Sequence, residues 1–241
     1  MSMYPNARVR RPVELEYARD NRAVVNFFNT VYAWMAVGLA LTAAVAWFAS
    51  QSMATVQMIY GNKGGYLLFG LLAFGIAWYV QSQAGKINVN VATGLFLVYA
   101  TIVGMLISAI FLIYSPKTLI SAFVLTAGTF GGMSIYGFVT KRDLSGIGSI
   151  LVMCAWGLII ASVVNIFIGS GPLSWIITYG VLAVFIGITA YETQMLKEIA
   201  MSIGDDPVLA PRYAIVGSLV LYISFINIFL SILRILGKAE E

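Results

Sequence analysis

The strongest candidate for chemistry in this sequence is a carboxyl group inside a long apolar segment. Glu192, in Tyr191-Glu192-Thr193-Gln194, is the one acid that lies clearly within such a segment, which we place at 174–195. An ionised carboxylate at mid-bilayer costs about 2.5–3.5 kcal/mol, because loss of water disfavours the charged form. Glu192 could therefore switch between neutral and charged states, as a proton-sensitive ion site requires. An interfacial acid would give the same pattern, since the expected segment end is only about 6 Å away.

Polar side chains also interrupt the last apolar segment. Ser224, Asn227 and Ser231 are spaced three and four residues apart, so a helix places them on one face. Tyr222 lies in the same segment, and Asn165 is a further polar candidate in an earlier one. Such a face turns towards other helices or a water-filled cavity. Ordinary interhelical hydrogen bonds, worth about 1 kcal/mol or less each, are the slightly better explanation for each residue when it is taken alone.

Two short polar connections carry the remaining charged candidates. Lys141, Arg142 and Asp143 form a compact charged turn, which we interpret as a cytoplasmic anchor, although it could also bind lipid headgroups or a neighbouring loop. Asp205 and Asp206 could attract cations. Two adjacent acids without further ligand spacing are weak support for a calcium site, so we predict no firm metal site.

Composition excludes several functional classes. The chain has no histidine, which removes the usual general base, zinc ligand and pH switch. No P-loop, H-E-x-x-H or G-x-S-x-G motif is present, so we predict neither an enzyme nor a cofactor site. The net charge of +4 comes without a basic stripe, which argues against a nucleic-acid partner. The single cysteine, Cys154, allows no internal disulfide and is expected to pack in its apolar segment.

The elements that must position these residues are membrane-spanning helices. The 241 residues are 60% hydrophobic and 10% charged, and the apolar residues form runs of the roughly 20 residues that cross a bilayer. We predict an all-α integral membrane protein with a tail at 1–26, a membrane domain at 27–237 and a short C-terminal tail at 238–241. The seven spans are placed at 27–49, 66–82, 91–114, 118–139, 147–168, 174–195 and 213–235.

Basic residues predict the orientation of these spans. The N-terminal side holds the larger share of lysine and arginine, which indicates a cytoplasmic N-terminus and an external C-terminus. Those on the N-terminal side are Arg8, Arg10, Arg11, Arg19, Arg22, Lys86, Lys141, Arg142, Lys197 and Arg212. Those on the opposite side are Lys63, Lys117, Arg234 and Lys238. A re-entrant span would reverse the C-terminal half of this assignment.

Small and aromatic residues suggest how the spans pack. Gly104 with Ser108, and Gly128 with Gly132, form small-xxx-small pairs that let helix backbones approach closely in lipid. Trp175 lies near the start of a span, as expected of an interfacial aromatic residue.

Several of these segments resemble the signature of the Bax inhibitor family (transmembrane Bax inhibitor motif proteins). The resemblance is carried by Gly187 to Gln194, Leu221 to Leu230 with Leu233 and Arg234, and, for the bacterial branch, Tyr136 to Ser145 and Ala161 to Phe167. It implies a seven-helix fold whose last helix is central and wrapped by the other six. It also implies a pH-sensitive, calcium-permeable leak, and a bacterial inner-membrane location. Eukaryotic members suppress cell death, and a bacterial member modulates a membrane-anchored ATP-dependent protease.

The sequence departs from this family pattern at its proposed pH sensor. The family usually has aspartate where this chain has Glu192, and a second aspartate where it has Ser224. Relatives pair those acids with an arginine on the second span, where this chain offers Gln81 and Gln83, with Lys86 just beyond. Because Ser224 cannot ionise, the coupled titration of two acids is not expected here.

Two hypotheses follow for the function. The first is a passive cation leak, in which Glu192 makes transient contact with Ca²⁺ and Ser224 and Asn227 line the path. The second is an interaction protein that restrains a membrane protease. A proton-coupled transporter is weaker, because it needs a substrate-sized polar cavity. One geometric difficulty remains, since Ser224 is expected about 15–18 Å inside its span, much deeper than Glu192. The two can meet only if the sixth span extends past Lys197 or the last begins later.

Overall fold

Helices make up almost the whole of the computed structural model, which describes residues 12–61 and 63–239. These residues contain no strand, and their helices are α1 (Pro12–Ser50), α2 (Met53–Tyr60), α3 (Lys63–Ser82), α4 (Val89–Ile107), α5 (Ile110–Ile113), α6 (Pro116–Val139), α7 (Ser145–Ile168), α8 (Gly171–Ile203) and α9 (Leu209–Ala239). Helix α1 continues upstream of its apolar part, into the predicted tail. Arg8, Arg10 and Arg11, which were predicted to lie on the cytoplasmic side, are outside the described residues.

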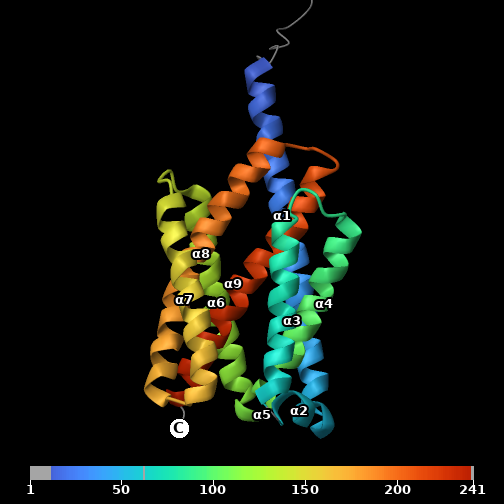
Figure 1. The fold of residues 1–241 in the computed structure, drawn as a ribbon. Coiled ribbons are helices and arrows are strands. Elements are labelled where there is room, and N and C mark those ends of the chain that lie inside the picture. The colour runs from blue at the N-terminus through green and yellow to red at the C-terminus, as the bar shows by residue number, and fades with distance from the viewer. Residues whose placement is uncertain (1–11, 62, 240–241) are drawn as a thin grey trace, which may run out of the picture.

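Within the described residues, seven helical segments are long and apolar enough to cross a membrane, which confirms the predicted fold class. They are 22–50, 64–82, 89–113, 116–139, 145–168, 171–203 and 209–238, and they run side by side along the molecule (Figure 1). The third consists of α4 and α5, because the helix breaks at Ser108, whose hydroxyl donates to Met105 O at 2.8 Å. The short helix α2 was not predicted from the sequence, and it lies across one end of the bundle.

The breaks between spans follow from local capping. Ser115 accepts a hydrogen bond from Thr118 N at 3.2 Å, and Pro116 follows it in the first turn of α6, where proline needs no hydrogen-bond partner. Helix α7 ends at Gly169, whose φ of 70° is left-handed and favours glycine. Ser170 then caps α8. Both breaks lie where the sequence predicted them.

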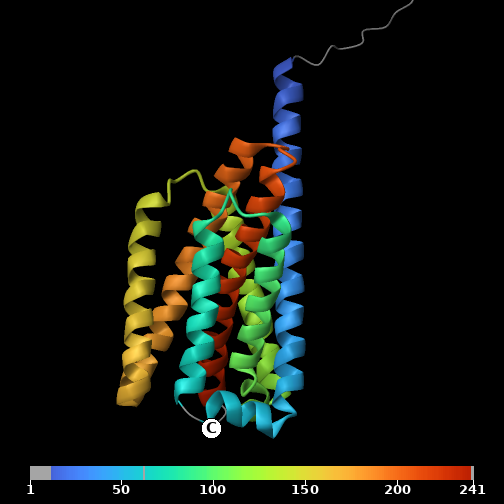
Figure 2. The same cartoon turned by 45° about the vertical axis from the view of Figure 1, so that its right-hand side comes forward.

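Helix α9 is the central element. It is the most buried of the seven spans, and it packs against α1, α3, α4, α6 and α8. Leu219, Leu221, Tyr222 and Ile228 are almost completely buried along it. Helix α7 instead packs against α8 and lies at the periphery (Figure 2). Five of the other six described spans therefore pack against α9, and the prediction that all six wrap the last helix is confirmed only in part.

Only one of the two predicted small-residue pairs lies at a helix contact. A Cβ added to Gly104 would lie 2.8 Å from Thr42 O on α1, so this glycine does allow close packing of α4 on α1. Nothing lies within 4 Å of a Cβ added to Gly128 or Gly132. The prediction that this second pair brings helices together was wrong within a single chain, because that face of α6 is open.

Candidate functional site

The carboxyl group of Glu192 and the hydroxyl group of Ser224 meet between α8 and α9. Ser224 Oγ donates a hydrogen bond to Glu192 Oε2 at 2.6 Å. Ser224 is fully buried, whereas Glu192 keeps partial access to the surface. Helix α8 continues past Lys197 to Ile203, and this extension lets Glu192 reach the depth of Ser224. It resolves the difficulty posed by the predicted end of the span at 195.

Close contact between helices fixes the segment that carries Glu192. Gly137 on α6 lies against the backbone of Ala190 on α8, and a Cβ at Gly137 would overlap the carbonyl oxygen of Ala190. On α7, Gly148 lies against the ring of Tyr191 in the same way. Two glycines on two neighbouring helices therefore hold the two residues that precede Glu192 in place.

A chain of hydroxyl groups joins the same segment to α6 and α1. Thr193 is fully buried, and it donates to Thr189 O at 2.8 Å. Its Oγ1 lies 3.0 Å from Ser134 Oγ on α6, and Tyr32 OH on α1 donates to Ser134 at 3.1 Å. Sequence reasoning missed Ser134 and Tyr32. The only available signal was that Ser134 lies three residues before Gly137, on the face of α6 that contacts α8.

Gln194 holds the backbone of the α6–α7 connection. Its Oε1 accepts from Leu144 N at 2.8 Å, and its Nε2 donates to Arg142 O at 2.8 Å. Nearby, Lys197 Nζ donates to Phe138 O at 2.8 Å and lies 5.0 Å from the centroid of that ring. Gln194 thus joins α8 to this connection, and Lys197 joins α8 to the last turn of α6.

The three charged side chains of this connection lie at the surface. Lys141, Arg142 and Asp143 are all exposed. Asp143 accepts a hydrogen bond from Ser145 N at 2.8 Å, and this bond lowers the pKa of its carboxyl group. The structure thus separates the charged turn from Glu192, and Gln194 is the link between the two.

The other predicted polar residues are used locally. Asn227 donates to Ile223 O at 2.8 Å, and Ser231 donates to Asn227 O at 2.8 Å, which continues a polar face from Ser224 along α9. Tyr222 faces another way, and its hydroxyl lies 2.6 Å from Thr42 Oγ1 on α1.

Asn165 is far from Glu192. Its amide donates to Ser174 Oγ at 2.7 Å and accepts from Ser170 N at 3.1 Å, so it closes the α7–α8 turn. Ser174 lies about 27 Å along α8 from Glu192 at 1.5 Å per residue. Asn165 is thus not brought together with the other predicted site residues.

One of the two predicted cation-attracting acids, Asp206, has a structural use. Asp206 Oδ1 accepts from the backbone N–H groups of Leu209 and Val208, both at 2.8 Å, and these bonds lower the pKa of its carboxyl group. It therefore caps the start of α9. Within the described residues, no three His, Cys, Asp or Glu side chains gather as a metal site would require.

Gln81, near the place of the expected second-span arginine, is used within its own helix. Gln81 donates to Ala77 O of its own helix at 3.1 Å. The α3–α4 connection is instead bound from α9, where Arg212 Nη1 donates to Gly85 O at 3.0 Å.

Comparisons with known proteins cover nearly the whole chain. The model of the family described as "Inhibitor of apoptosis-promoting Bax1" matches residues 24–241. The "Inner membrane protein YbhL" of Escherichia coli K12 is 44% identical over 88% of this chain and 91% of its own length. A protein of Deinococcus radiodurans is 41% identical over 90% of this chain and 92% of its own. A protein of Borreliella burgdorferi is 39% identical over 89% and 93%.

Proposed function

The chain belongs to the Bax inhibitor-1 family of membrane proteins, and from that premise we propose that it is a passive cation leak controlled by Glu192. The carrying observation is the 2.6 Å hydrogen bond between Ser224 on the central helix and this carboxyl group. The cation is Ca²⁺, which takes oxygen ligands and would contact Glu192 only transiently. We place the protein in a bacterial inner membrane, as the name of the E. coli relative suggests, with its N-terminus in the cytoplasm.

The position of Glu192 supports a gating role. The side chain lies at the seam between α8 and the central helix α9 and keeps partial access to the surface. Beyond it, Ser224, Asn227 and Ser231 continue a polar face along α9. Phe225 and Ile228 on the same helix are buried in the core of the bundle. Opening then requires α9 to move relative to α8, which breaks the bond to Ser224. The protonation state of Glu192 sets the strength of that bond.

Ca²⁺ flux into proteoliposomes tests the proposal. The wild-type protein is compared with Glu192→Gln at acidic and neutral pH, and Glu198→Gln is the control, since Glu198 is an exposed acid farther along α8. We expect flux in the wild type and in Glu198→Gln, and its loss in Glu192→Gln. Absence of flux above empty liposomes from folded wild-type protein would reject the leak.

The pH dependence of this flux should be shallow. Of the two described residues that form this bond, Glu192 can ionise and Ser224 cannot, so a single protonation controls the bond, without the coupled titration of two acids. Ser224→Asp restores a second acid and should steepen the dependence. A steep acid-to-neutral curve in the wild type would contradict this part of the proposal.

The α6–α7 connection favours a second candidate, a membrane protein that binds and restrains a membrane-anchored ATP-dependent protease. Three consecutive charged side chains, Lys141 to Asp143, are exposed on a backbone that Gln194 holds in place. A fixed, charged surface suits recognition of another protein. In this case protease restraint should survive Glu192→Gln and be lost when Lys141 and Arg142 are replaced by glutamine. The opposite pattern would favour the leak.

A further inference from the structure

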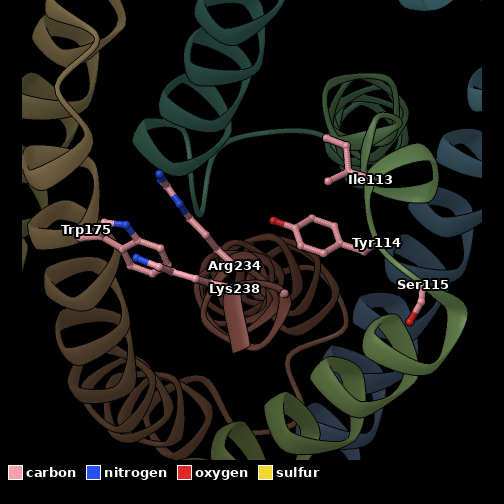
Figure 3. Close-up of a pocket in the computed structure, with 7 residues that line it drawn as sticks. Ile113, Tyr114, Ser115, Trp175, Arg234 and Lys238 are labelled. Atoms are coloured by element: carbon pink, nitrogen blue, oxygen red, sulfur yellow. The ribbon is translucent and has the colours of Figure 1, made fainter. Parts of the chain in front are cut away.

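The polar face of α9 ends in two basic residues at the C-terminal end of the bundle. Arg234 and Lys238 follow Ser231 at spacings of three and four, so they continue its face. Both are exposed. They border a hollow of about 590 Å³ between α9, the start of α8 and the connection between α5 and α6. Figure 3 shows Arg234 and Lys238 extending from α9 beside Trp175, with Tyr114 facing them from that connection.

The two cations are held close together by one aromatic ring. Lys238 Nζ lies 4.5 Å from the centroid of the Trp175 ring, and Arg234 Cζ lies 5.3 Å from it. Tyr114 packs against Gly237, where a Cβ would overlap its ring. Among the described residues that line the hollow, none is acidic. Two positive charges beside an open hollow whose described lining contains no acid make a site for an anion.

A second hollow adjoins the first at Arg234. It has a volume of about 350 Å³ and lies between α7, α8 and the turn that joins them, where apolar Ile166 and Ile177 line it together with polar Ser162, Asn165 and Ser174. Large apolar side chains are exposed around both hollows, among them Ile113 and Ile176 at 70% and 67%. On a membrane-spanning bundle, such surface faces acyl chains. The anion site therefore opens towards lipid and towards the membrane surface at once.

We propose that this end of the bundle binds an anionic phospholipid, with Arg234 and Lys238 holding its phosphate group. The Tyr114 hydroxyl faces the same hollow, and Trp175 has the place of an interfacial anchor. The smaller hollow accommodates the start of an acyl chain. Arginine forms paired hydrogen bonds with phosphate, and lysine adds a point charge. This site does not depend on whether the protein conducts ions.

Lipid binding to the full-length protein in neutral detergent tests the proposal. Native mass spectrometry would compare phosphatidylglycerol, which is anionic, with phosphatidylcholine, which has no net charge. The double variant Arg234→Gln/Lys238→Gln should bind phosphatidylglycerol about tenfold more weakly, or worse, because it loses two charge-assisted contacts. Lys117→Gln is the matched control, since Lys117 is exposed at the same end and does not line the hollow. It should bind as the wild type does.

Further measurements distinguish a bound phospholipid from other ligands of the hollow. Arg234→Lys keeps the charge but loses the paired hydrogen bonds, so its affinity should lie between those of the wild type and the double variant, which guards against a folding defect in the double variant. Equal binding of both lipids, or an unchanged double variant, overturns the proposal. Displacement of the lipid by an equal concentration of inorganic phosphate would identify a free-anion site instead. Binding that appears only after residues 240–241 are deleted would show that the chain's own C-terminal carboxylates occupy the hollow.

Discussion

Replacing Gly137 by alanine places a methyl group where α6 already touches the backbone of α8. The new Cβ would overlap the carbonyl oxygen of Ala190, and a helical backbone cannot rotate away as a side chain can. Helices α6 and α8 must therefore separate. Forcing a methyl group into a packed contact costs about 1–3 kcal/mol. The displaced segment carries Glu192, so its 2.6 Å bond to Ser224 should be strained as well.

Thermal unfolding in detergent, together with Ca²⁺ flux, measures both effects. At about 2–4 °C per kcal/mol for a chain of this size, Gly137→Ala should unfold several degrees below the wild type. Gly132→Ala is the control on the same helix, because nothing lies within 4 Å of its Cβ and it shares the gain in helix propensity. Gly148→Ala should be intermediate, since the Tyr191 ring that it meets can shift. Equal unfolding temperatures for the Gly137 and Gly132 variants would refute the assigned contact.

Three further predictions concern single side chains. Gln194→Ala removes two hydrogen bonds to the α6–α7 connection, each worth about 1 kcal/mol. The Leu144 amide should therefore exchange faster with deuterium. An unchanged exchange rate would mean that Gln194 does not stabilise the conformation of this connection. Asp206 has a lowered pKa, so its cap stabilises the fold above the ordinary aspartate pKa and is lost as pH falls through the lowered value. The stability difference between the wild type and Asp206→Ala should accordingly be present at neutral pH and vanish in strong acid. Tyr222→Phe loses only its bond to Thr42, and should lower stability by about 1 kcal/mol or less in equilibrium unfolding.

The spans were predictable because a bilayer imposes a fixed length on every apolar run. The ends of the spans were harder to predict, and α8 shows why. After Tyr191 its sequence becomes polar at Glu192, Gln194 and Lys197, so the apolar run stops while the helix continues to Ile203. Helical hydrogen bonds need no lipid, and these polar side chains find partners on α6, α9 and the α6–α7 connection. Hydropathy therefore placed Glu192 near the membrane surface, at the end of its apolar run, although the helix continues beyond that point.

The candidate site was only partly predictable for a related reason. Ser224 and Glu192 were singled out as separate polar residues, and nothing in their spacing along the chain implied a contact. The resemblance to the family suggested that these two positions meet. Ser134 and Tyr32, which join the same segment to α6 and α1, carried no comparable signal, because single hydroxyl groups are common in membrane helices.

Glu192 and Ser224 have the same combined side-chain length as the two aspartates expected from the family resemblance. A glutamate oxygen lies one bond farther from its Cα than an aspartate oxygen, and a serine oxygen lies one bond nearer. The pair therefore spans the same gap between α8 and α9 as two aspartates, with one fewer acid. Glu192→Asp alone should then break the 2.6 Å contact and lower stability by about 0.6–1.7 kcal/mol, the range for hydrogen bonds between membrane helices.

Adding Ser224→Asp to Glu192→Asp should recover that loss at mildly acidic pH, where two close carboxyl groups can share a proton. A double-mutant cycle at acidic and neutral pH measures the coupling between the two positions. If the two substitutions simply add at both pH values, the side chains are not matched in length, and the hydrogen bond between α8 and α9 does not set the geometry of this site.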